Sequence, residues 1–589
     1  MKRDQVDPRY KWNLDSIIKE SDWEKAFSDL SSSKDALAAY RGKLADKEVL
    51  LACLKEESAR SIVLENLYVF AKMKQDEDTA LSSSQSRVGR IRTLAAELSG
   101  LSSFITPEIL SSYSEKELLE LSSLEAFSDY SYVLTELARN RKRYLSDKEE
   151  KILARVSQVA GGYQNAFTMF DNADVKFKDV KNDAGETVRL THGVYSELLM
   201  SANREVRRGA YESMFSAYKD MINTIGALYL GNIEKDEFFA FFRGYKTALE
   251  MYMDGENVSV EAYLNLLKGV ESGLPALQKY LDYRKKALGL PSLTMYDLHV
   301  PVAKNADIKL EYEDAYDLVI RALSCLGEDY VRLLKKARDE GWIDVYETEN
   351  KRSGAYSWGT YTSHPYVLLN YKKTTHDVFT IAHELGHAIH SYKSNAAQPF
   401  PKAGYEIFVA EIASTVNEML LIRYLLKEGK ADRNFLLAYL ADMFRTTFFR
   451  QTMFAEFEKA AHEKVENDGT VTPEELCEIY SALNVKYYGE EPTDELIRYE
   501  WARIPHFYTS YYVYKYATGI VSAAAISKDI FEGKEGALEG YMRFLSLGGS
   551  KPPLEILKEA GVDLTSSEPF EKAVALFSEA VSELSGHEA

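Results

Sequence analysis

The sequence predicts a mostly helical globular protein with a small amount of β-sheet. Apolar residues recur at spacings of three and four along most of the chain, and strict alternation is confined to a few short regions. Helix breakers are scarce, with 14 prolines and 32 glycines among 589 residues. The composition, 46% hydrophobic and 28% charged, is that of an ordinary globular protein long enough to bury a large core.

The N-terminal part is predicted to be a run of amphipathic helices from Asp22 to about residue 160. The helical period is clear in "WEKAFSDLSSSKDALAAYRGKL" and "ELLELSSLEAFSDYSYVLTELARN", where serine and aspartate stand at plausible helix starts. Residues 172–193 then alternate on both sides of Asn182-Asp183-Ala184-Gly185, which predicts a β-hairpin. We place a boundary here, between a helical domain of residues 1–195 and a second domain of residues 196–589.

The second domain is predicted to be helical from Tyr195, with two extended interruptions. Residues 297–310, "DLHVPVAKNADIKL", are expected to be irregular or extended. Residues 354–373, "GAYSWGTYTSHPYVLLNYKK", combine glycine breaks with an apolar run that predicts a strand. Helices fill the rest, apart from breaks at "ENDGTVTP" and "SLGGSKPP". The small sheet therefore lies next in sequence to a cluster of histidines.

Charge and cysteine content limit which partners and which cellular compartment are expected. The chain has 72 basic and 91 acidic residues, net -19, and this field repels phosphate backbones, so no nucleic-acid partner is expected. Cys53, Cys325 and Cys477 are too few and too widely spaced for a disulfide framework, which fits a reducing compartment. The N-terminus lacks the apolar core of a signal peptide, and no stretch approaches the roughly 18 apolar residues of a membrane span. We expect a cytoplasmic protein that does not associate with membranes.

"TIAHELGHAIHSY", residues 380–392, predicts a metal site. On a helix His383 and His387 project from one face one turn apart, so both rings reach one ion at the roughly 2.0–2.1 Å typical of zinc. Glu384 is rotated away from this pair and suits the general base beside a water at the metal. The alternative is a buried helix with structural histidines, because the short motif also arises by chance. Gly386 costs about 1 kcal/mol relative to alanine, which favours a close approach by another element.

A hydrolytic zinc site needs a third protein ligand and an open fourth position. "GYEIFVAEIASTVNEMLLIRYLL" offers Glu406, Glu411 and Glu418. Glu411 stands in an apolar helical segment, where an ionised carboxylate is costly unless a cation meets it. Glu418 lies on the same face and, like Ser414, suits a group that holds a ligand histidine by its second nitrogen. The alternative for Glu418 is a solvated helix face.

Two more residues near the histidines are expected to support the site. His390 suits packing or support better than ligation, because a fourth protein ligand would leave no room for water. Asp377, six residues before His383, is another group that suits support of a ligand.

"WARIPHFYTSYYVYKYATG", residues 501–519, is dense in hydrogen-bond donors. Histidine and tyrosine donate to the oxyanion that forms when a carbonyl is attacked, and loss of one such donor typically costs about 3 to 4 kcal/mol. His506 and the pair Tyr511 and Tyr514, which share a predicted helical face, are the candidates. The alternative is an aromatic stripe buried in a core.

These segments together resemble oligoendopeptidase F, of the thimet-oligopeptidase-like family of zinc metallopeptidases. The resemblance extends in order over nearly the whole chain. It rests on "RYKWNLDSI", "FDNADVKF", "LTHGVYSELLMSANREVRR", "RSGAYSWG", "PYVLLNY", "HELGHAIHS", "FVAEIASTVNE", "RQTMFAEFE", "IPHFYTSYYVYKYATG" and "GGSKPPLEILKEAGVDL".

The resemblance implies a mostly helical, two-lobed fold of the zincin type with a deep substrate channel and one zinc ion per chain. It implies a cytoplasmic endopeptidase that cuts short, unstructured peptides. It also implies that His383, His387 and Glu411 are the zinc ligands and that Glu384 is the base.

The resemblance further implies residues that contact the substrate. His506, Tyr511 and Tyr514 would stabilise the intermediate, and Tyr508 or Tyr516 could replace one of these tyrosines. Tyr508 is also expected to bind substrate. The strand around Gly354 and Tyr356 resembles an edge to which a substrate backbone adds.

Two alternatives have different requirements. A carboxypeptidase or dipeptidyl carboxypeptidase of similar fold would need a basic residue for the free C-terminus of its substrate. A non-catalytic helical peptide-binding protein would need only structural histidines.

Overall fold

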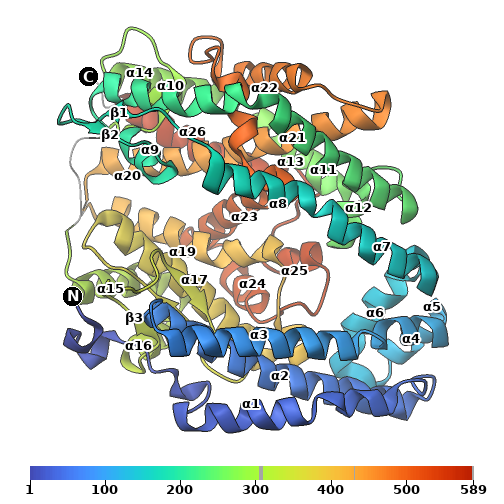
Figure 1. Cartoon of the computed structure of the whole chain (residues 1–589). Helices are drawn as coiled ribbons and strands as arrows, with labels where there is room; N and C mark the ends of the chain where they lie inside the picture. The colour runs from blue at the N-terminus through green and yellow to red at the C-terminus, as the bar shows by residue number, and fades with distance from the viewer. Residues whose placement is uncertain (304–308, 430, 587–589) are drawn as a thin grey trace. The chain divides into compact units, whose positions relative to one another are not determined.

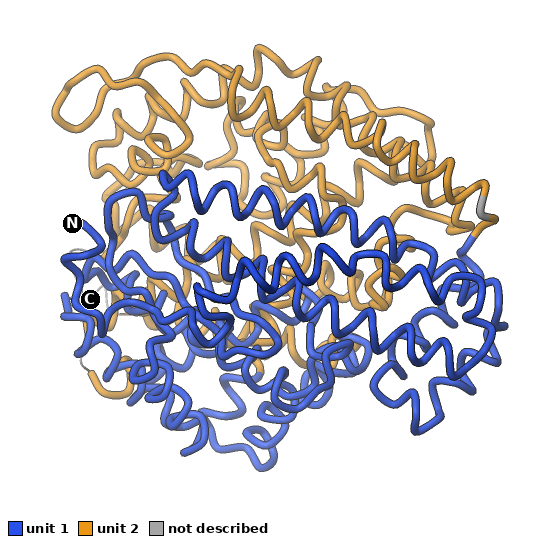
Figure 2. Tube along the Cα trace, turned by 60° about the horizontal axis from the view of Figure 1, so that its bottom comes forward, with its two compact units in different colours: residues 1–144, 307–424, 526–562 blue, residues 145–306, 425–525, 563–589 orange. Residues whose placement is uncertain are grey.

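The computed structural model describes residues 1–303, 309–429 and 431–586. The fold is predominantly helical, as predicted (Figure 1), and it divides into two compact units (Figure 2). Unit 1 comprises residues 1–144, 307–424 and 526–562, and unit 2 comprises residues 145–306, 425–525 and 563–589. The chain therefore enters each unit more than once. The single domain boundary after residue 195 stays a prediction.

Most of unit 1 is helical. Its α-helices are α1 Trp23–Ser32, α2 Lys47–Glu77, α3 Ser82–Ser102, α4 Ile105–Ser112, α5 Glu115–Ser122, α6 Ser131–Asn140, α15 Tyr312–Ala322, α16 Glu328–Asp339, α17 Thr375–Ala397, α18 Phe400–Ala403, α19 Ile407–Glu428, α24 Ala537–Phe544 and α25 Pro553–Glu559. Its three strands are β3 Ile343–Asp344, β4 Tyr356–Trp358 and β5 Tyr366–Leu368. The last turn of α19 belongs to unit 2.

Unit 2 holds the remaining α-helices and a hairpin. The helices are α7 Asp147–Ala160, α8 Gly162–Met169, α9 His192–Leu198, α10 Arg204–Asp220, α11 Ile222–Phe242, α12 Ala248–Gly255, α13 Val260–Glu271, α14 Leu274–Ala287, α20 Arg433–Met443, α21 Arg450–Asp468, α22 Pro473–Tyr488, α23 Tyr514–Phe531 and α26 Glu568–Gly586. The strands are β1 Val180–Lys181 and β2 Thr187–Val188. The end of α23 belongs to unit 1.

Short segments of other helix types complete the structure. Two are π-helical, η8 Phe170–Asp174 and η11 Phe444–Phe449. The 3₁₀ segments are η1 Arg3–Gln5, η2 Pro8–Tyr10, η3 Leu14–Ser16, η4 Glu20–Asp22, η5 Lys34–Tyr40, η6 Glu125–Tyr130, η7 Arg141–Arg143, η9 Met295–Leu298, η10 Leu323–Leu326, η12 Ile497–Arg503 and η13 Pro505–Tyr508.

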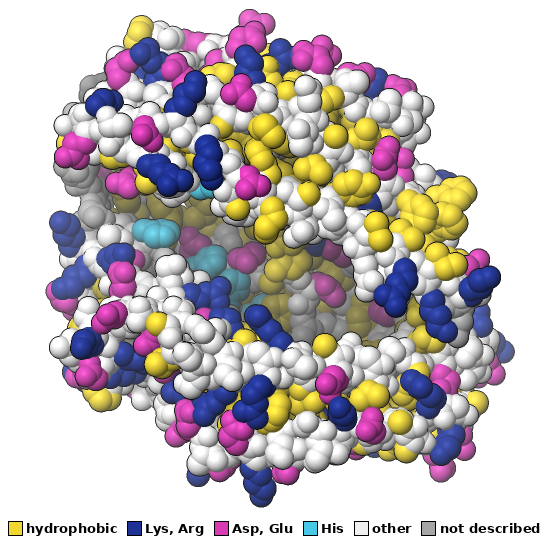
Figure 3. All heavy atoms as spheres, viewed as in Figure 1, with side chains coloured by type: hydrophobic (Ala, Val, Ile, Leu, Met, Phe, Trp, Pro, Cys, Tyr) yellow, Lys and Arg dark blue, Asp and Glu magenta, His cyan; other side chains and the backbone are white. Residues whose placement is uncertain are grey.

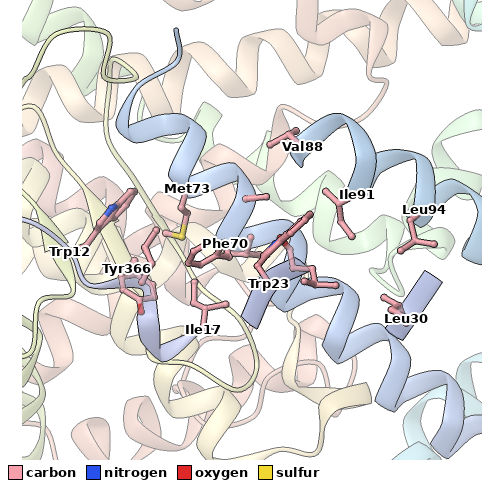
Figure 4. Close-up of a cluster of buried hydrophobic side chains, with 14 of the residues drawn as sticks. Trp12, Ile17, Trp23, Leu30, Phe70, Met73, Val88, Ile91, Leu94 and Tyr366 are labelled. Atoms are coloured by element: carbon pink, nitrogen blue, oxygen red, sulfur yellow. The ribbon is translucent and has the colours of Figure 1, made fainter. Parts of the chain in front are cut away.

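A hydrophobic core of unit 1 joins its first helices to its sheet (Figure 4). Trp23, Phe70 and Ile91, from α1, α2 and α3, are fully buried there. Figure 4 shows Trp12 and Tyr366 at the end of the cluster nearest Met73, and their rings lie 6.1 Å apart. Because Tyr366 belongs to β5, burial of these aromatic rings fixes the sheet against the helices.

The three-stranded sheet lies beside the helix that carries the histidine motif. The strand order is β3-β5-β4, with β3 parallel and β4 antiparallel to β5. Tyr356 of β4 faces Leu368 of β5 in the register, and β4 stands at the edge of the sheet. Both β4 and β5 contact α17. The predicted small sheet beside the motif helix is therefore confirmed.

Other predicted elements are also confirmed. Helices α1 to α7 occupy the predicted N-terminal run, and β1 and β2 form the antiparallel hairpin with Gly185 at φ 77° in its turn. The predicted breaks separate α21 from α22 and α24 from α25. The expected irregular segment 297–310 begins at the end of η9, and its residues 304–308 lie outside the described part. Among the described residues, no helix has both the length and the apolar character needed to cross a bilayer.

Candidate metal centre and substrate-contact residues

The helices α17 and α19 approach each other at Gly386. A Cβ atom added to Gly386 would lie 2.6 Å from the carbonyl oxygen of Ala413 and 2.6 Å from the Cα atom of Ser414. Both of those atoms are backbone, so they cannot move aside as a flexible side chain could. The glycine within the motif therefore lets two helix backbones touch, which accounts for its presence despite its low helix propensity.

Gly386→Ala is expected to destabilise the protein by about 1–3 kcal/mol, because the clash outweighs the gain in helix propensity. Thermal unfolding would measure this loss. Gly89→Ala is the matched control, since Gly89 lies inside α3 with no atom within 4 Å of the added Cβ. The control should be neutral or stabilising by up to about 1 kcal/mol. Equal effects of the two substitutions would contradict the role given to the contact.

His383, His387 and Glu411 bring three ligand atoms together. The Nε2 atoms of His383 and His387 lie 3.5 Å and 3.4 Å from Oε2 of Glu411. The two imidazole rings are 4.9 Å apart, and one donor atom from each of the three residues lies within 4.8 Å of the others. Ligand atoms about 2.1 Å from a tetrahedral ion stand roughly 3.4 Å from one another. The spacing of these atoms therefore suits a metal ion.

The electrostatics of this trio also favour a cation. Burial opposes ionisation of Glu411, yet hydrogen bonds from His383 and His387 hold its pKa well below the usual range. Burial also opposes a charged His383, but hydrogen bonds to Glu411 and Glu418 raise its pKa to about 10. The trio thus attracts a proton strongly when no metal is present. A divalent ion would take the place of that proton, so metal binding should release protons.

Residues of α19 hold the trio in place. Nδ1 of His383 lies 2.5 Å from Oε1 of Glu418, which directs Nε2 of the same ring toward Glu411. The Ser414 hydroxyl donates to the Glu411 carbonyl oxygen over 2.8 Å and to Oε2 of its side chain over 3.3 Å. Glu418 thus holds a histidine as expected, whereas Ser414 contacts Glu411 rather than a histidine.

Asn417 is a supporting residue that the sequence did not single out. Its amide donates to the carbonyl oxygen of Ala382, directly before His383, over 2.9 Å. The hydroxyl of Tyr330 in turn donates to Oδ1 of Asn417 over 2.9 Å, and Asn417 is fully buried. A polar residue within the apolar run of α19 was the available signal.

Glu384 lies beside the ligand pair in a nearly closed environment. Its side chain is only 7% exposed, and burial raises its pKa above the usual value, although the two histidines oppose this. A carboxyl group with a raised pKa binds a proton more readily than an ordinary glutamate, which suits proton transfer.

The other residues near the motif have different roles. His390 is 1% exposed and stacks on Tyr405 with ring centroids 3.9 Å apart, so it has a packing role. Asp377 does not reach a ligand, because its carboxylate caps α17 by accepting the N–H groups of Thr374 and Lys372 over 2.8 Å and 3.0 Å. Glu406 precedes α19 and is exposed.

In unit 2, His506 forms an aromatic cluster with Tyr512 and Tyr516. Nε2 of His506 lies 3.3 Å from the Tyr516 hydroxyl, and the ring of Tyr512 is 6.0 Å from the imidazole and 5.5 Å from the ring of Tyr516. Solvent reaches all three side chains. Burial lowers the pKa of His506, so the imidazole is neutral near pH 7.

Tyr511 and Tyr514 do not join this cluster. They are 2% and 1% exposed, and the Tyr514 hydroxyl donates to Glu256 over 3.0 Å. The shared helical face expected for them does not exist, because α23 begins only at Tyr514 and Tyr511 has a left-handed φ of 54°. Tyr508 is also buried and stacks on Phe167 at 4.3 Å. Tyr508, Tyr511 and Tyr514 therefore belong to a buried aromatic core, which was the alternative interpretation of this segment.

The strained backbone of Tyr511 is held by Glu458 of α21. The Tyr511 N–H donates to Oε1 of Glu458 over 2.7 Å, and Glu458 is 1% exposed. Burial raises the pKa of Glu458 to about 8, against the lowering effects of His462, the Tyr511 N–H and Lys235; Asp236 adds to the rise. This carboxyl group therefore stays protonated in the folded protein at pH values where it is ionised in the unfolded chain.

Glu458→Gln is expected to flatten the pH dependence of stability between about pH 4.5 and 8. In this window the folded protein holds a proton that the unfolded chain has lost, so stability falls as pH rises, on the order of 1.4 kcal/mol per unit of pKa shift at most. The amide carbonyl still accepts the Tyr511 N–H but does not titrate. Urea unfolding at several pH values would measure the slope. Glu463→Gln, on the exposed face of α21, is the control, and an unchanged slope in Glu458→Gln would contradict the assignment.

The strand expected to bind substrate is the edge strand β4. Tyr356 is partly exposed, and its hydroxyl donates over 3.0 Å to the fully buried Asp76. The carbonyl oxygen of Gly354 accepts from the Asn370 amide over 2.8 Å, and Gly354 has a φ of 83° that other residues rarely adopt. These bonds fix the entry to β4 and the direction of its free edge.

Known proteins are similar to this chain in both sequence and fold. Residues 197–576 match the family model described as Peptidase family M3, and residues 109–177 match the one described as Oligopeptidase F. Oligopeptidase PepF of Bacillus subtilis (strain 168) is 39% identical over 99% of this chain and 88% of its own length. Group B oligopeptidase PepB of Streptococcus agalactiae is 37% identical over 99% of this chain and 98% of its own length.

A solved structure agrees with these matches. The oligoendopeptidase-F of Enterococcus faecium is 31% identical, with a TM-score of 0.74 over 96% of this chain and 99% of that protein. The matched family model covers more than half of the present chain and includes both α17 and α19. The chain therefore belongs to peptidase family M3, in its oligoendopeptidase F group, and is a metallo-endopeptidase.

Proposed function

We propose that this protein is a zinc-dependent endopeptidase that hydrolyses internal bonds of short, unstructured oligopeptides. The observation that carries the proposal is the convergence of His383, His387 and Glu411 on one point, with Glu384 beside them. The printed names of the relatives, oligopeptidase and oligoendopeptidase, support the substrate class. Action in the cytoplasm and a deep substrate channel remain part of the same proposal.

The residues present fit zinc in three respects. Two imidazole nitrogens and one carboxylate oxygen are donors that zinc accepts, and three protein ligands leave a fourth position open. The second nitrogen of His383 is held by Glu418, as is common for histidines that bind metals. When bound, zinc supplies Lewis acidity that polarises a carbonyl and lowers the pKa of a water to about 7.

Glu384 performs the proton transfers in this proposal. Its carboxylate accepts a proton from the attacking water and then gives that proton to the leaving amine. Its partly raised pKa suits both steps, because the group must hold the proton and release it again. The charges of the neighbouring imidazoles oppose the effect of burial and favour the ionised form that accepts the proton.

Further groups are proposed to contact the substrate. We assign the stabilisation of the developing oxyanion to His506 with Tyr512 and Tyr516, in place of the buried Tyr511 and Tyr514. The substrate backbone is proposed to add to the free edge of β4, at Gly354 and Tyr356.

Metal content and product masses test the proposal together. Purified protein is expected to contain about one zinc per chain, and a chelator should abolish peptide cleavage until zinc is restored. A peptide blocked at both ends should be cut internally, which a carboxypeptidase or dipeptidyl carboxypeptidase would not do. Cleavage that survives removal of all metal would refute the mechanism. Metal without cleavage would favour a binding protein.

A further inference from the structure

His299 lies on a segment of unit 2 whose backbone is held by hydrogen bonds on both sides of this residue. Arg284 of α14 is fully buried, and its Nη2 atom donates to the carbonyl oxygens of Asp297 over 3.1 Å and Val300 over 2.6 Å. The His299 side chain itself is exposed. Its position is therefore set by a buried guanidinium group rather than by contacts of its own ring.

The same guanidinium group reaches Arg445 through Asp442. Nη1 of Arg284 donates to both carboxylate oxygens of Asp442, over 3.2 Å and 3.1 Å. Oδ1 of Asp442 also accepts from Nε of Arg445 over 2.8 Å. A continuous set of hydrogen bonds therefore connects the His299 segment to Arg445.

The π-helical segment η11 connects Arg445 to Arg450, because the Arg450 N–H donates to the carbonyl oxygen of Arg445 in the i→i+5 pattern of a π-helix. Arg450 binds Glu500 through both terminal nitrogens, over 3.1 Å and 2.6 Å. Arg503 also contacts Glu500, over 3.5 Å. A π-helical insertion of this kind often accompanies a functional site.

Positive charge exceeds negative charge in this group. Among the described residues, two carboxylates, those of Asp442 and Glu500, pair with four arginines, Arg284, Arg445, Arg450 and Arg503. The carboxylate of the nearby Asp297 is already paired with Arg204 and Arg207, at 2.7 Å each. This excess contrasts with the net charge of -19 and with the mixture of acidic and basic side chains on the face shown in Figure 3.

The field at His299 reflects that excess. Burial is the largest cause that lowers the pKa of His299, and the next four causes are the charges of Arg445, Arg450, Arg284 and Arg503. The side chain is nevertheless exposed to solvent. The imidazole is neutral near pH 7 and can donate a hydrogen bond without adding charge.

Arg445 supplies donors that the protein leaves unused. The residue is only 4% exposed, and Nε is its one nitrogen with a hydrogen-bond partner among the described residues. Neither terminal nitrogen is closed off from solvent. A buried guanidinium group whose two terminal nitrogens have no partner can bind the two oxygens of a carboxylate through parallel hydrogen bonds.

We propose that Arg445 and His299 form an anion site in unit 2 that binds a carboxylate. Arg450 and Arg503 supply supporting positive charge, and Arg284 positions both elements of the site. Two sources provide this chemistry, the C-terminal carboxylate of an oligopeptide and a free small carboxylate such as acetate. The peptide source rests on the proposed function, whereas the site itself does not.

The first experiment compares two peptides that differ only at the C-terminus, one a free acid and one an amide. Both carry an N-terminal fluorophore and are titrated into zinc-loaded Glu384→Gln protein, so that binding is measured without cleavage. The acid should bind at least about tenfold more tightly, the usual effect of a charge-assisted hydrogen bond. Adding Arg445→Gln should remove this preference, and Arg445→Lys should restore part of it.

The second experiment measures binding of acetate to protein without peptide, as a saturable rise in unfolding temperature. His299→Ala should weaken it severalfold, and this variant loses no hydrogen bond to a described residue, so its folding is not in question. Arg433→Gln is the control, because Arg433 is an exposed arginine of unit 2 that pairs with Glu583. Its binding should equal that of the wild-type protein.

The outcomes separate the sources. A preference for the acid peptide that depends on Arg445 supports the site with the peptide carboxylate as ligand. Equal binding of acid and amide, with acetate binding that depends on Arg445 and His299, supports the site with a small carboxylate as ligand. The absence of both effects overturns the proposal. Residual cleavage by Glu384→Gln would instead count against the proposed function and leave the acetate experiment valid.

Discussion

Glu384→Gln is expected to lower kcat/KM for a blocked, internally quenched peptide by on the order of 10³-fold while the protein keeps one zinc per chain. The amide keeps the shape of the side chain but cannot accept a proton from water. The proposed ligand atoms belong to His383, His387 and Glu411, so the metal site should be unaffected. Steady-state kinetics and elemental analysis of the same preparation would measure both results.

Glu406→Gln is the matched control for this prediction. Glu406 is an exposed carboxylate that precedes α19, and its loss should change kcat/KM by less than about twofold. A Glu384→Gln protein that retained a tenth or more of wild-type activity would remove Glu384 from the proton transfers. A variant that lost its zinc as well would show instead that Glu384 supports the metal.

Glu411→Ala is expected to abolish cleavage by a different route, through loss of the metal. Only two imidazole ligands remain in this variant, and two protein ligands are fewer than a catalytic zinc site uses. Glu418→Gln should keep the ligands and weaken zinc binding by only about 10- to 100-fold, because Glu418 acts through His383. The order of zinc affinity should therefore be wild type, then Glu418→Gln, then Glu411→Ala.

Competition with a chromophoric chelator would measure these affinities. The zinc affinity of the wild-type protein should also depend on pH and be weaker at low pH, because zinc must displace a proton from His383, His387 and Glu411. A Glu411→Ala protein with one tightly held zinc would mean that the third ligand lies elsewhere. Circular dichroism would exclude unfolding as the cause of metal loss.

Several features of the site follow from local sequence alone. His383 and His387 share a helix face because four residues make about one turn, whatever the rest of the fold does. Glu411 could be singled out because an ionised carboxylate within an apolar helix needs a counter-charge. Gly386 indicated a close contact through its helix propensity alone, and the contact with Ser414 supplies the reason.

Other features depended on backbone geometry that the local pattern does not encode. The pairing of Tyr511 with Tyr514 assumed a helix through both residues, but a left-handed residue at Tyr511 delays the start of α23 and turns both rings inward. Tyr512 and Tyr516 reach His506 instead. Asp377 has the spacing of a capping box with Thr374, and that local interaction uses its carboxylate.

By itself the sequence determined the helical class, the hairpin, the sheet beside the motif helix and the candidate metal ligands. The reason is that hydrophobic period and residue type act over a few neighbours. Tertiary structure alone decided that segments far apart in the chain share a unit and that Asn417 supports α17. It also decided that Arg284 connects His299 to Arg445. Contacts between distant segments depend on packing of the whole chain, and that packing also decides which side chains reach solvent.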